Sequence, residues 1–183
     1  KTTQCNCANC LMMNRDSNAY TFGFAAAMVV VVASVLAFTA SSLKDLQQEN
    51  VRKEKMQNIL ATIGIETDRD GAEVLFNDHI VSQLALRNDG SVDEDVDPFS
   101  GIKLALELKK DPSEQRFPLY LANVKEASYY IIPLRGSGLW DAIWGYIALE
   151  SDRNTIKGAV FDHKAETAGL GAEITQQWFM DRF

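Results

Sequence analysis

The chain has 183 residues, of which 25 are acidic and 18 are basic, so its formal net charge is −7. This acidic balance argues against a nucleic-acid ligand and against binding to anionic lipid through a polybasic segment, because both need a surplus of Lys and Arg. The part of the chain that follows the long apolar segment described below is large enough for one domain with its own hydrophobic core.

Residues 1–18 form an N-terminal tail that contains all three cysteines, Cys5, Cys7 and Cys10. Thiolates at this spacing would suit zinc or copper, whereas iron–sulfur clusters usually need four ligands. The sequence opens on Lys1, however, and Met13 is a plausible natural start. We therefore regard residues 1–12 as a candidate extension, expect no metal site, and expect the chain to be truncated at both ends.

The next segment, residues 19–42, is predicted to be a transmembrane helix. From Ala19 to Ala40 it contains no charge, and a helix of that length reaches about 33 Å, enough to cross the hydrocarbon core. A buried core helix is one alternative, but it would normally show a polar stripe. A cleaved signal peptide ending at Phe38-Thr39-Ala40 is another, although signal cores are shorter than this run. We expect an uncleaved anchor.

The orientation of the anchor is not decided by local charge. Lys1 and Arg15 precede the span, and four basic residues follow it closely: Lys44, Arg52, Lys53 and Lys55. This bias would keep the C-terminal side in the cytoplasm, but long domains are translocated largely regardless of such charges.

Residues 43–63 carry apolar side chains at helical spacing among charged ones, which predicts an amphipathic stalk helix that Gly64 ends. Residues 64–183 then form an α+β domain with a mixed β-sheet. Its first half is predicted to hold a helix, a loop and a short segment that is either strand or helical turn: Ala72–Gln83, Asn88–Gly101 and Leu104–Leu108. Four strands and a closing helix follow: Phe117–Ala122, Ser128–Leu134, Ile143–Glu150, Thr155–Asp162 and Ala172–Phe183.

Few side chains suggest metal or nucleophilic chemistry. The acidic run Asp93–Asp97 lacks the glycine and closing Glu of an EF-hand, so a solvated loop is expected there. His163 with Glu166 invites a metal-site or general-base interpretation, yet the chain has only two histidines and no third ligand is evident. No Ser-His-Asp or Cys-His group is credible.

Two glycine-containing stretches remain, Arg135–Trp140 and His163–Glu173. Both are consistent with tight turns, and neither is a phosphate-binding signature. Gly169 and Gly171 would also let the backbone approach a flat ligand, ahead of a helix whose N-terminal amides point outward. Apolar walls for a planar ring would come from Trp140 and Leu170, and Thr167 would donate to a ring carbonyl. Alternatively, Trp140 and Trp144 are core residues.

The sequence from Met13 to Phe183 is similar to the C subunit of the Na+-translocating NADH:quinone reductases. The resemblance rests on the anchor Asn18–Phe38, the runs Leu46–Asn50 and Gln57–Leu60, and above all Gly136-Ser137-Gly138-Leu139-Trp140 and His163–Ile174. The last stretch is close to the family pattern H-x-E-T-P-G-L-G-A-E-I, with Ala168 in the proline position.

The resemblance implies a subunit that carries FMN, attached through its phosphate to a threonine of an S-G-A-T type motif that this chain does not contain. It implies electron relay between a neighbouring subunit and ubiquinone, with the other subunits and membrane lipid as partners, in the bacterial inner membrane with the domain outside the cytoplasm. By position, six residues would lie against the flavin: Leu139, Trp140, Thr167, Gly169, Leu170 and Gly171.

Two alternatives remain. The related flavin-bearing G subunit of Rnf-type ferredoxin:NAD+ oxidoreductases shares the anchor and the FMN but differs in its electron donor. A membrane-anchored binding or adaptor domain with no redox role is the alternative from another class.

Overall fold

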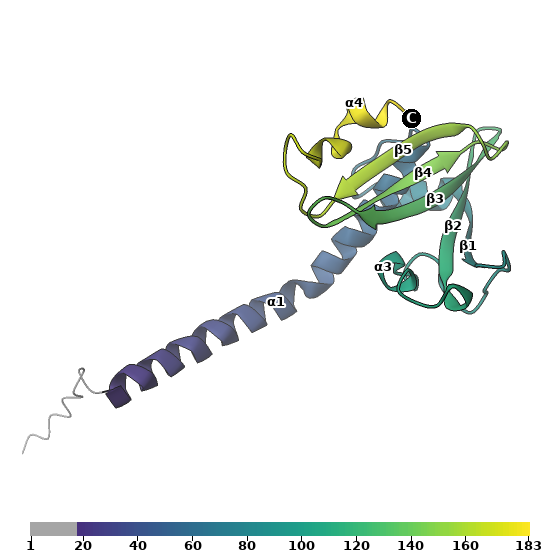
Figure 1. The fold of residues 1–183 in the computed structure, drawn as a ribbon. Helices are drawn as coiled ribbons and strands as arrows, with labels where there is room; N and C mark the ends of the chain where they lie inside the picture. Colours follow the sequence, from purple (N-terminus) through teal and green to yellow (C-terminus); the bar gives the residue numbers. More distant parts are fainter. Residues whose placement is uncertain (1–17) are drawn as a thin grey trace, which may run out of the picture. The chain divides into compact units, whose positions relative to one another are not determined.

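The computed structural model describes residues 18–183, so the predicted tail and its three cysteines lie outside the described residues. A single helix of 45 residues, α1 (Asn18–Thr62), contains both the predicted span and the predicted stalk (Figure 1). The chain divides into two compact units with the boundary after Gln48, inside this helix.

The N-terminal unit contains the apolar part of α1. Its large side chains, such as Phe22 and Phe38 (each 75% exposed), have no protein cover, and the most apolar window of the helix is not buried at all. Thr39 and Ser42 satisfy their hydroxyls by donating to the carbonyls of Val35 (2.8 Å) and Phe38 (2.9 Å). The alternative of a buried core helix is therefore wrong, and the described residues contain one helix long and apolar enough to cross a membrane.

The C-terminal unit, Glu49–Phe183, is an α+β domain built on one sheet of five strands: β1 (Ile80–Arg87), β2 (Arg116–Val124), β3 (Ala127–Ser137), β4 (Ala142–Leu149) and β5 (Ile156–His163). Short helices make up the remaining regular structure: α2 (Ala72–His79), α3 (Leu104–Glu107), α4 (Gln177–Met180) and the 3-10 turns η1 (Pro112–Glu114) and η2 (Ala172–Thr175).

The fold class is as predicted, but the sheet is not mixed. Its strands follow the order β1-β2-β3-β4-β5, and every pairing is antiparallel. The connections between successive strands from β2 to β5 are short, and that between β2 and β3 consists of Lys125-Glu126 alone. Parallel neighbours would need a long crossover connection between each pair of strands, so these short connections require antiparallel pairing.

Two helical predictions need correction, and the structure decides one choice that the sequence left open. The helix predicted over Ala72–Gln83 ends at His79, because Ile80 and Val81 begin an alternating strand that pairs with β2. The ambiguous segment Leu104–Leu108 forms the one-turn helix α3. The closing helix predicted over Ala172–Phe183 consists of two separate turns, η2 and α4, with extended Gln176 between them.

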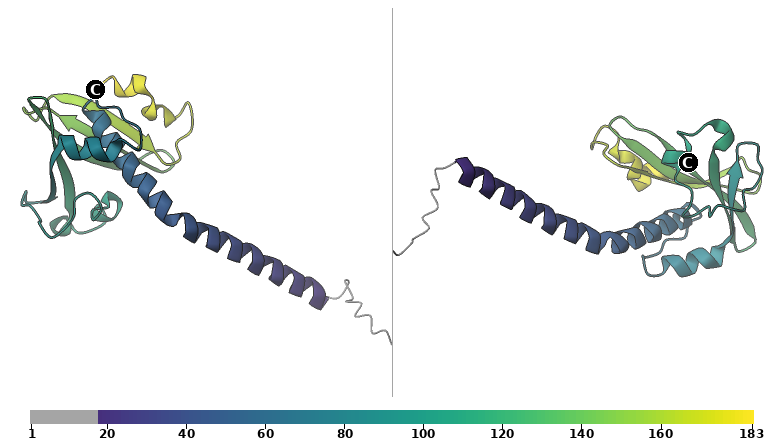
Figure 2. Two further views of the ribbon diagram at one scale, coloured as in Figure 1. Left: turned by 180° about the vertical axis from the view of Figure 1, so that it is seen from behind. Right: turned by 90° about the horizontal axis from the view of Figure 1, so that it is seen from below.

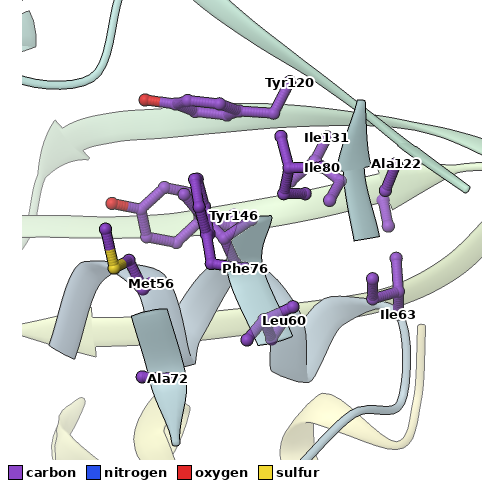
Figure 3. Close-up of a cluster of buried hydrophobic side chains, with 12 residues drawn as sticks. Met56, Leu60, Ile63, Ala72, Phe76, Ile80, Tyr120, Ala122, Ile131 and Tyr146 are labelled. Carbon is purple, nitrogen blue, oxygen red and sulfur yellow. The ribbon is translucent and has the colours of Figure 1, made fainter. Parts of the chain in front are cut away.

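The core lies between the end of α1, helix α2 and one face of the sheet (Figure 3). Fully buried Ile59 and Leu60 of α1 belong to the same cluster as Phe76 of α2 and Tyr120 of β2. Thr62 comes so close to β5 that a Cβ on Gly158 would lie 2.6 Å from its carbonyl oxygen. Helix α4 packs on the opposite face through Phe161 and Phe179, whose ring centroids are 6.0 Å apart (Figures 1 and 2).

The acidic loop is not wholly solvated, contrary to the expectation from its sequence. Asp93 is buried, with its carboxylate 3.0 Å from Arg87 Nη2 and bonded to Arg116 Nε. Arg116 first and Arg87 second hold the pKa of Asp93 down to about 2. Buried Glu107 binds Lys110 Nζ (2.7 Å) and the amide of Arg116 (3.1 Å). These pairs fasten the long β1–β2 connection to the sheet, since a buried carboxylate must find donors.

Candidate functional site

One of the two predicted stretches forms the tip of the β3–β4 hairpin. Gly138 donates its amide to the carbonyl of Asp141 (2.7 Å), which closes the turn directly after the last pair of the ladder, Ser137 with Ala142. Leu139 and Trp140 lie at this tip, and each is 66% exposed. The alternative that Trp140 is a core residue is therefore wrong, whereas Trp144, within β4, is half-buried.

The second stretch is the loop that follows β5. The amide of Leu170 donates to the carbonyl of Thr167 (3.0 Å), and Gly169 adopts the left-handed backbone (φ +82°) that glycine enters without steric cost. Leu170 is 64% exposed. The expected outward-pointing amides are not free, because the carboxylate of Glu173 accepts from Gly169 and from Gly171 (3.2 Å). These backbone donors, that of Gly169 first, lower the pKa of Glu173.

Glu166 joins the two loops. Its Oε1 accepts from the amides of Trp140 (3.1 Å) and Asp141 (3.4 Å), so one carboxylate holds the hairpin tip against the β5 loop. We call this arrangement the Glu166 clasp. A salt bridge between Lys164 and Asp141 (2.8 Å) makes a second link between the same loops.

Two glycines make room for the clasp. A Cβ on Gly138 would lie 2.1 Å from Glu166 Oε1, and a Cβ on Gly171 would lie 3.0 Å from Oε2. Oε2 is buried and has no hydrogen-bond partner among the described residues. The carboxylate of Glu166 thus makes a close contact at both positions, and at Gly138 the carbonyl oxygen of Asp141 makes a second one, 2.9 Å from the Cβ.

The structure therefore brings the six predicted residues into two adjoining groups, Leu139 and Trp140 on one loop and the other four on the second: Thr167, Gly169, Leu170 and Gly171. The link through Glu166 was not predicted, because the contact joins positions far apart in sequence that share no periodic pattern. The metal-site interpretation of His163 and Glu166 has no support in residues 18–183, where no three potential ligand side chains cluster. Nδ1 of His163 instead accepts the amide of Glu166 (3.2 Å).

An apolar helix long enough to cross a membrane and an antiparallel α+β domain behind it define a class of protein, the single domain carried on one membrane anchor. No protein-family model matches the chain. Two relatives are both named as the C subunit of the Na(+)-translocating NADH-quinone reductase. The one from Pseudomonas aeruginosa is 31% identical over 89% of this chain and 70% of its own length. The one from Vibrio campbellii is 29% identical over 88% and 69%.

A solved structure supports the same assignment. The crystal structure of the C subunit of this reductase from Parabacteroides distasonis is 36% identical, with a TM-score of 0.70 over 76% of this chain and 67% of that one. The chain therefore belongs to the family of the C subunits of the Na+-translocating NADH-quinone reductase. It is a membrane-anchored subunit of that enzyme complex, and its partners are the other subunits.

Proposed function

We propose that this subunit carries FMN against the two clasped loops and relays electrons between a neighbouring subunit and ubiquinone. The observation that supports this proposal best is the exposure of Leu139, Trp140 and Leu170 on loops that Glu166 holds together. Large apolar side chains at loop tips are costly to leave in water, and they suit the flat faces of an isoalloxazine ring.

The residues present fit such a ring. Trp140 offers a planar surface, and the left-handed turn at Gly169 removes a side chain that would keep the backbone away from a ligand. The amides of Trp140, Gly169 and Gly171 are already bonded to carboxylates, so the hydroxyl of Thr167 is the donor that we assign to a ring carbonyl. A bound flavin would supply the one- and two-electron chemistry, while these side chains orient it and exclude water.

We further propose that the soluble domain lies on the periplasmic side of the inner membrane, in contact with lipid through the exposed apolar half of α1. The family resemblance supports this orientation, and the basic residues after the span oppose it. Protease added to intact spheroplasts should remove a periplasmic domain. A domain that stays intact until the cells are lysed would refute the orientation.

The cofactor proposal is tested on the purified complex. Denaturing gel fluorescence and mass spectrometry should find FMN bonded to a threonine of this subunit, and the absence of any flavin adduct would refute the proposal. Trp140→Ala should shift the flavin midpoint potential. Trp178→Ala, a change at another half-exposed tryptophan that lies on α4, is the matched control and should not shift the potential.

The similarity to relatives named as the C subunit favours the quinone reductase over the Rnf-type complex. An adaptor domain without a redox role would show neither the adduct nor the potential.

A further inference from the structure

The chain has two histidines, and their rings face opposite kinds of hydrogen-bond partner. Nδ1 of His79 lies 2.9 Å from the carbonyl oxygen of Leu75, so this nitrogen must carry the hydrogen of the bond. Nδ1 of His163 lies 3.2 Å from the backbone nitrogen of Glu166, which is the donor, so this ring nitrogen must offer its lone pair. The neutral ring of His163 therefore has its hydrogen on Nε2.

A second proton has different effects on the two rings. On His79 the proton goes to Nε2, and the bond to Leu75 persists because Nδ1 is a donor in both states. On His163 the proton must go to Nδ1, where it would point at the amide hydrogen of Glu166. Protonation of His163 and its bond to Glu166 therefore exclude each other.

The bond to His163 holds the residue on which the Glu166 clasp depends. The backbone amide of Glu166 is bonded to His163 at the end of β5, while its Oε1 accepts the amides of Trp140 (3.1 Å) and Asp141 (3.4 Å). Loss of the first bond lets the backbone of Glu166 move. Any retreat of the carboxylate then weakens two bonds, one of which is already longer than the usual range.

The charges near His163 favour a positive ring once that bond is lost. Its cross-strand partner on β4 is the apolar Ile143, and α4 has no charged side chain. Near the ring in sequence or on η2 are the charged residues Asp162, Lys164, Glu166 and Glu173. Lys164 is paired with Asp141 at 2.8 Å, so the carboxylates prevail and would stabilise an imidazolium.

We propose that protonation of His163 controls the Glu166 clasp: the neutral ring keeps the two loops together, and the imidazolium releases them. Histidine ordinarily changes its charge between about pH 5 and 8, whereas carboxyl groups titrate near about pH 4. The exposed Trp140 and Leu170 are therefore held in fixed positions at neutral pH, and their loops loosen in mildly acidic solution. Both loops belong to the chain itself, so this control acts with or without a bound cofactor.

The test is hydrogen exchange of the whole chain in detergent, from about pH 8 down to about pH 5.5. The Trp140 rate is expressed as a protection factor, which divides out the intrinsic effect of pH on amide exchange. A neutral hydrogen bond changes an equilibrium about fivefold, so the protection of Trp140 should fall about fivefold across this range. Amides in the middle of β4 should keep their protection, because the sheet stays folded.

Three variants identify the titrating group. His163→Asn places a side-chain oxygen near the position of Nδ1, which accepts the Glu166 amide but takes up no proton, so protection should stay high throughout. His163→Phe keeps a ring without an acceptor, so protection should be about fivefold lower than in the unaltered chain already at the upper end of the range. His79→Gln removes the other imidazole and should keep the pH dependence of the unaltered chain.

The outcomes are distinct. Protection that falls with pH in the unaltered chain and in His79→Gln, but stays constant in both His163 variants, supports the proposed control. Constant protection in the unaltered chain, a fall that persists in His163→Asn, or full protection in His163→Phe at the upper end of the range each overturns it. None of these results bears on a covalent flavin found on the complex, so the control by His163 can fail while the proposed function stands.

Discussion

The Glu166 clasp allows a sharp prediction about the candidate site. Glu166→Ala removes the acceptor of the Trp140 and Asp141 amides, at 3.1 and 3.4 Å. A hydrogen bond to a charged acceptor contributes about 1.5–3 kcal/mol, and the longer of the two bonds counts for little. We therefore expect the loops to separate more easily by about 2 kcal/mol, which is about a thirtyfold change in the opening equilibrium.

Hydrogen exchange measures this opening directly. The amide of Trp140 should exchange about thirtyfold faster in Glu166→Ala, by the same arithmetic. Amides in the middle of β4 should keep their rates. Glu126→Ala, at an exposed carboxylate in the β2–β3 turn, is the matched control and should leave the Trp140 rate unchanged.

A second variant tests the same contact from the opposite side. Gly138→Ala would place its Cβ 2.1 Å from Glu166 Oε1, so it should open the clasp at least as much as Glu166→Ala. The two changes should add only in part. The contact of the Cβ with Oε1 exists only while Glu166 is present, whereas its contact with the carbonyl oxygen of Asp141, at 2.9 Å, persists without Glu166. Unchanged exchange at Trp140 in both variants, with the fold intact, would refute the view that this carboxylate holds the loops together.

Two predictions concern pH. Arg116 and Arg87 depress the pKa of Asp93 to about 2. The ionised Asp93 carboxylate therefore stabilises the fold above its unfolded-state pKa of about 4, and this contribution is lost as the pH falls from there toward 2. Urea midpoints measured from pH 6 to pH 2.5 should fall less steeply for Asp93→Asn than for the unaltered chain, and parallel curves would contradict this role of Asp93. Burial lowers the pKa of Lys55 to about 8 in the folded chain, whereas its pKa is about 10.4 in the unfolded chain. Between pH 8 and about 10.4 the unfolded chain binds one more proton than the folded chain, so the free energy of unfolding should rise with pH in this range. Lys55→Met should remove this rise, and a variant that keeps it would show that another group is responsible.

The strands were the most predictable part of the fold. Stretches such as Ser128–Leu134 and Ile143–Glu150 are dense in β-branched and aromatic residues, and turn residues separate them. Each of the four predicted strands therefore overlaps an observed strand closely. The pairing direction was not predictable from residue types alone, since it depends on how short the connections are. The helix at Ala72 was extended too far because Ile80 and Val81 satisfy a helical pattern as well as a strand pattern.

The candidate site was predictable only in part. Glycines and a tryptophan identify loops that a ligand could approach, and the structure places these loops side by side. A side chain at Gly138 or Gly171, however, would meet the carboxylate of Glu166, and at Gly138 also the carbonyl oxygen of Asp141. These contacts are apparent only in three dimensions. Similarly, the sequence shows Asp93 only as one member of an acidic run. Its two ion pairs, with Arg87 and Arg116, are apparent only from the structure.

The order of the strands has a consequence for how the domain assembles. Because each strand pairs with its neighbour in sequence, β2 to β5 can form one hairpin at a time, and each hairpin closes only a short loop. The pairing of β1 with β2 must instead close the whole connection of residues 88–115, whose entropic cost is larger. We therefore expect the edge that carries β1 and α2 to order last and to unfold first, whereas the strands that bear the clasped loops belong to the part of the sheet that forms most locally.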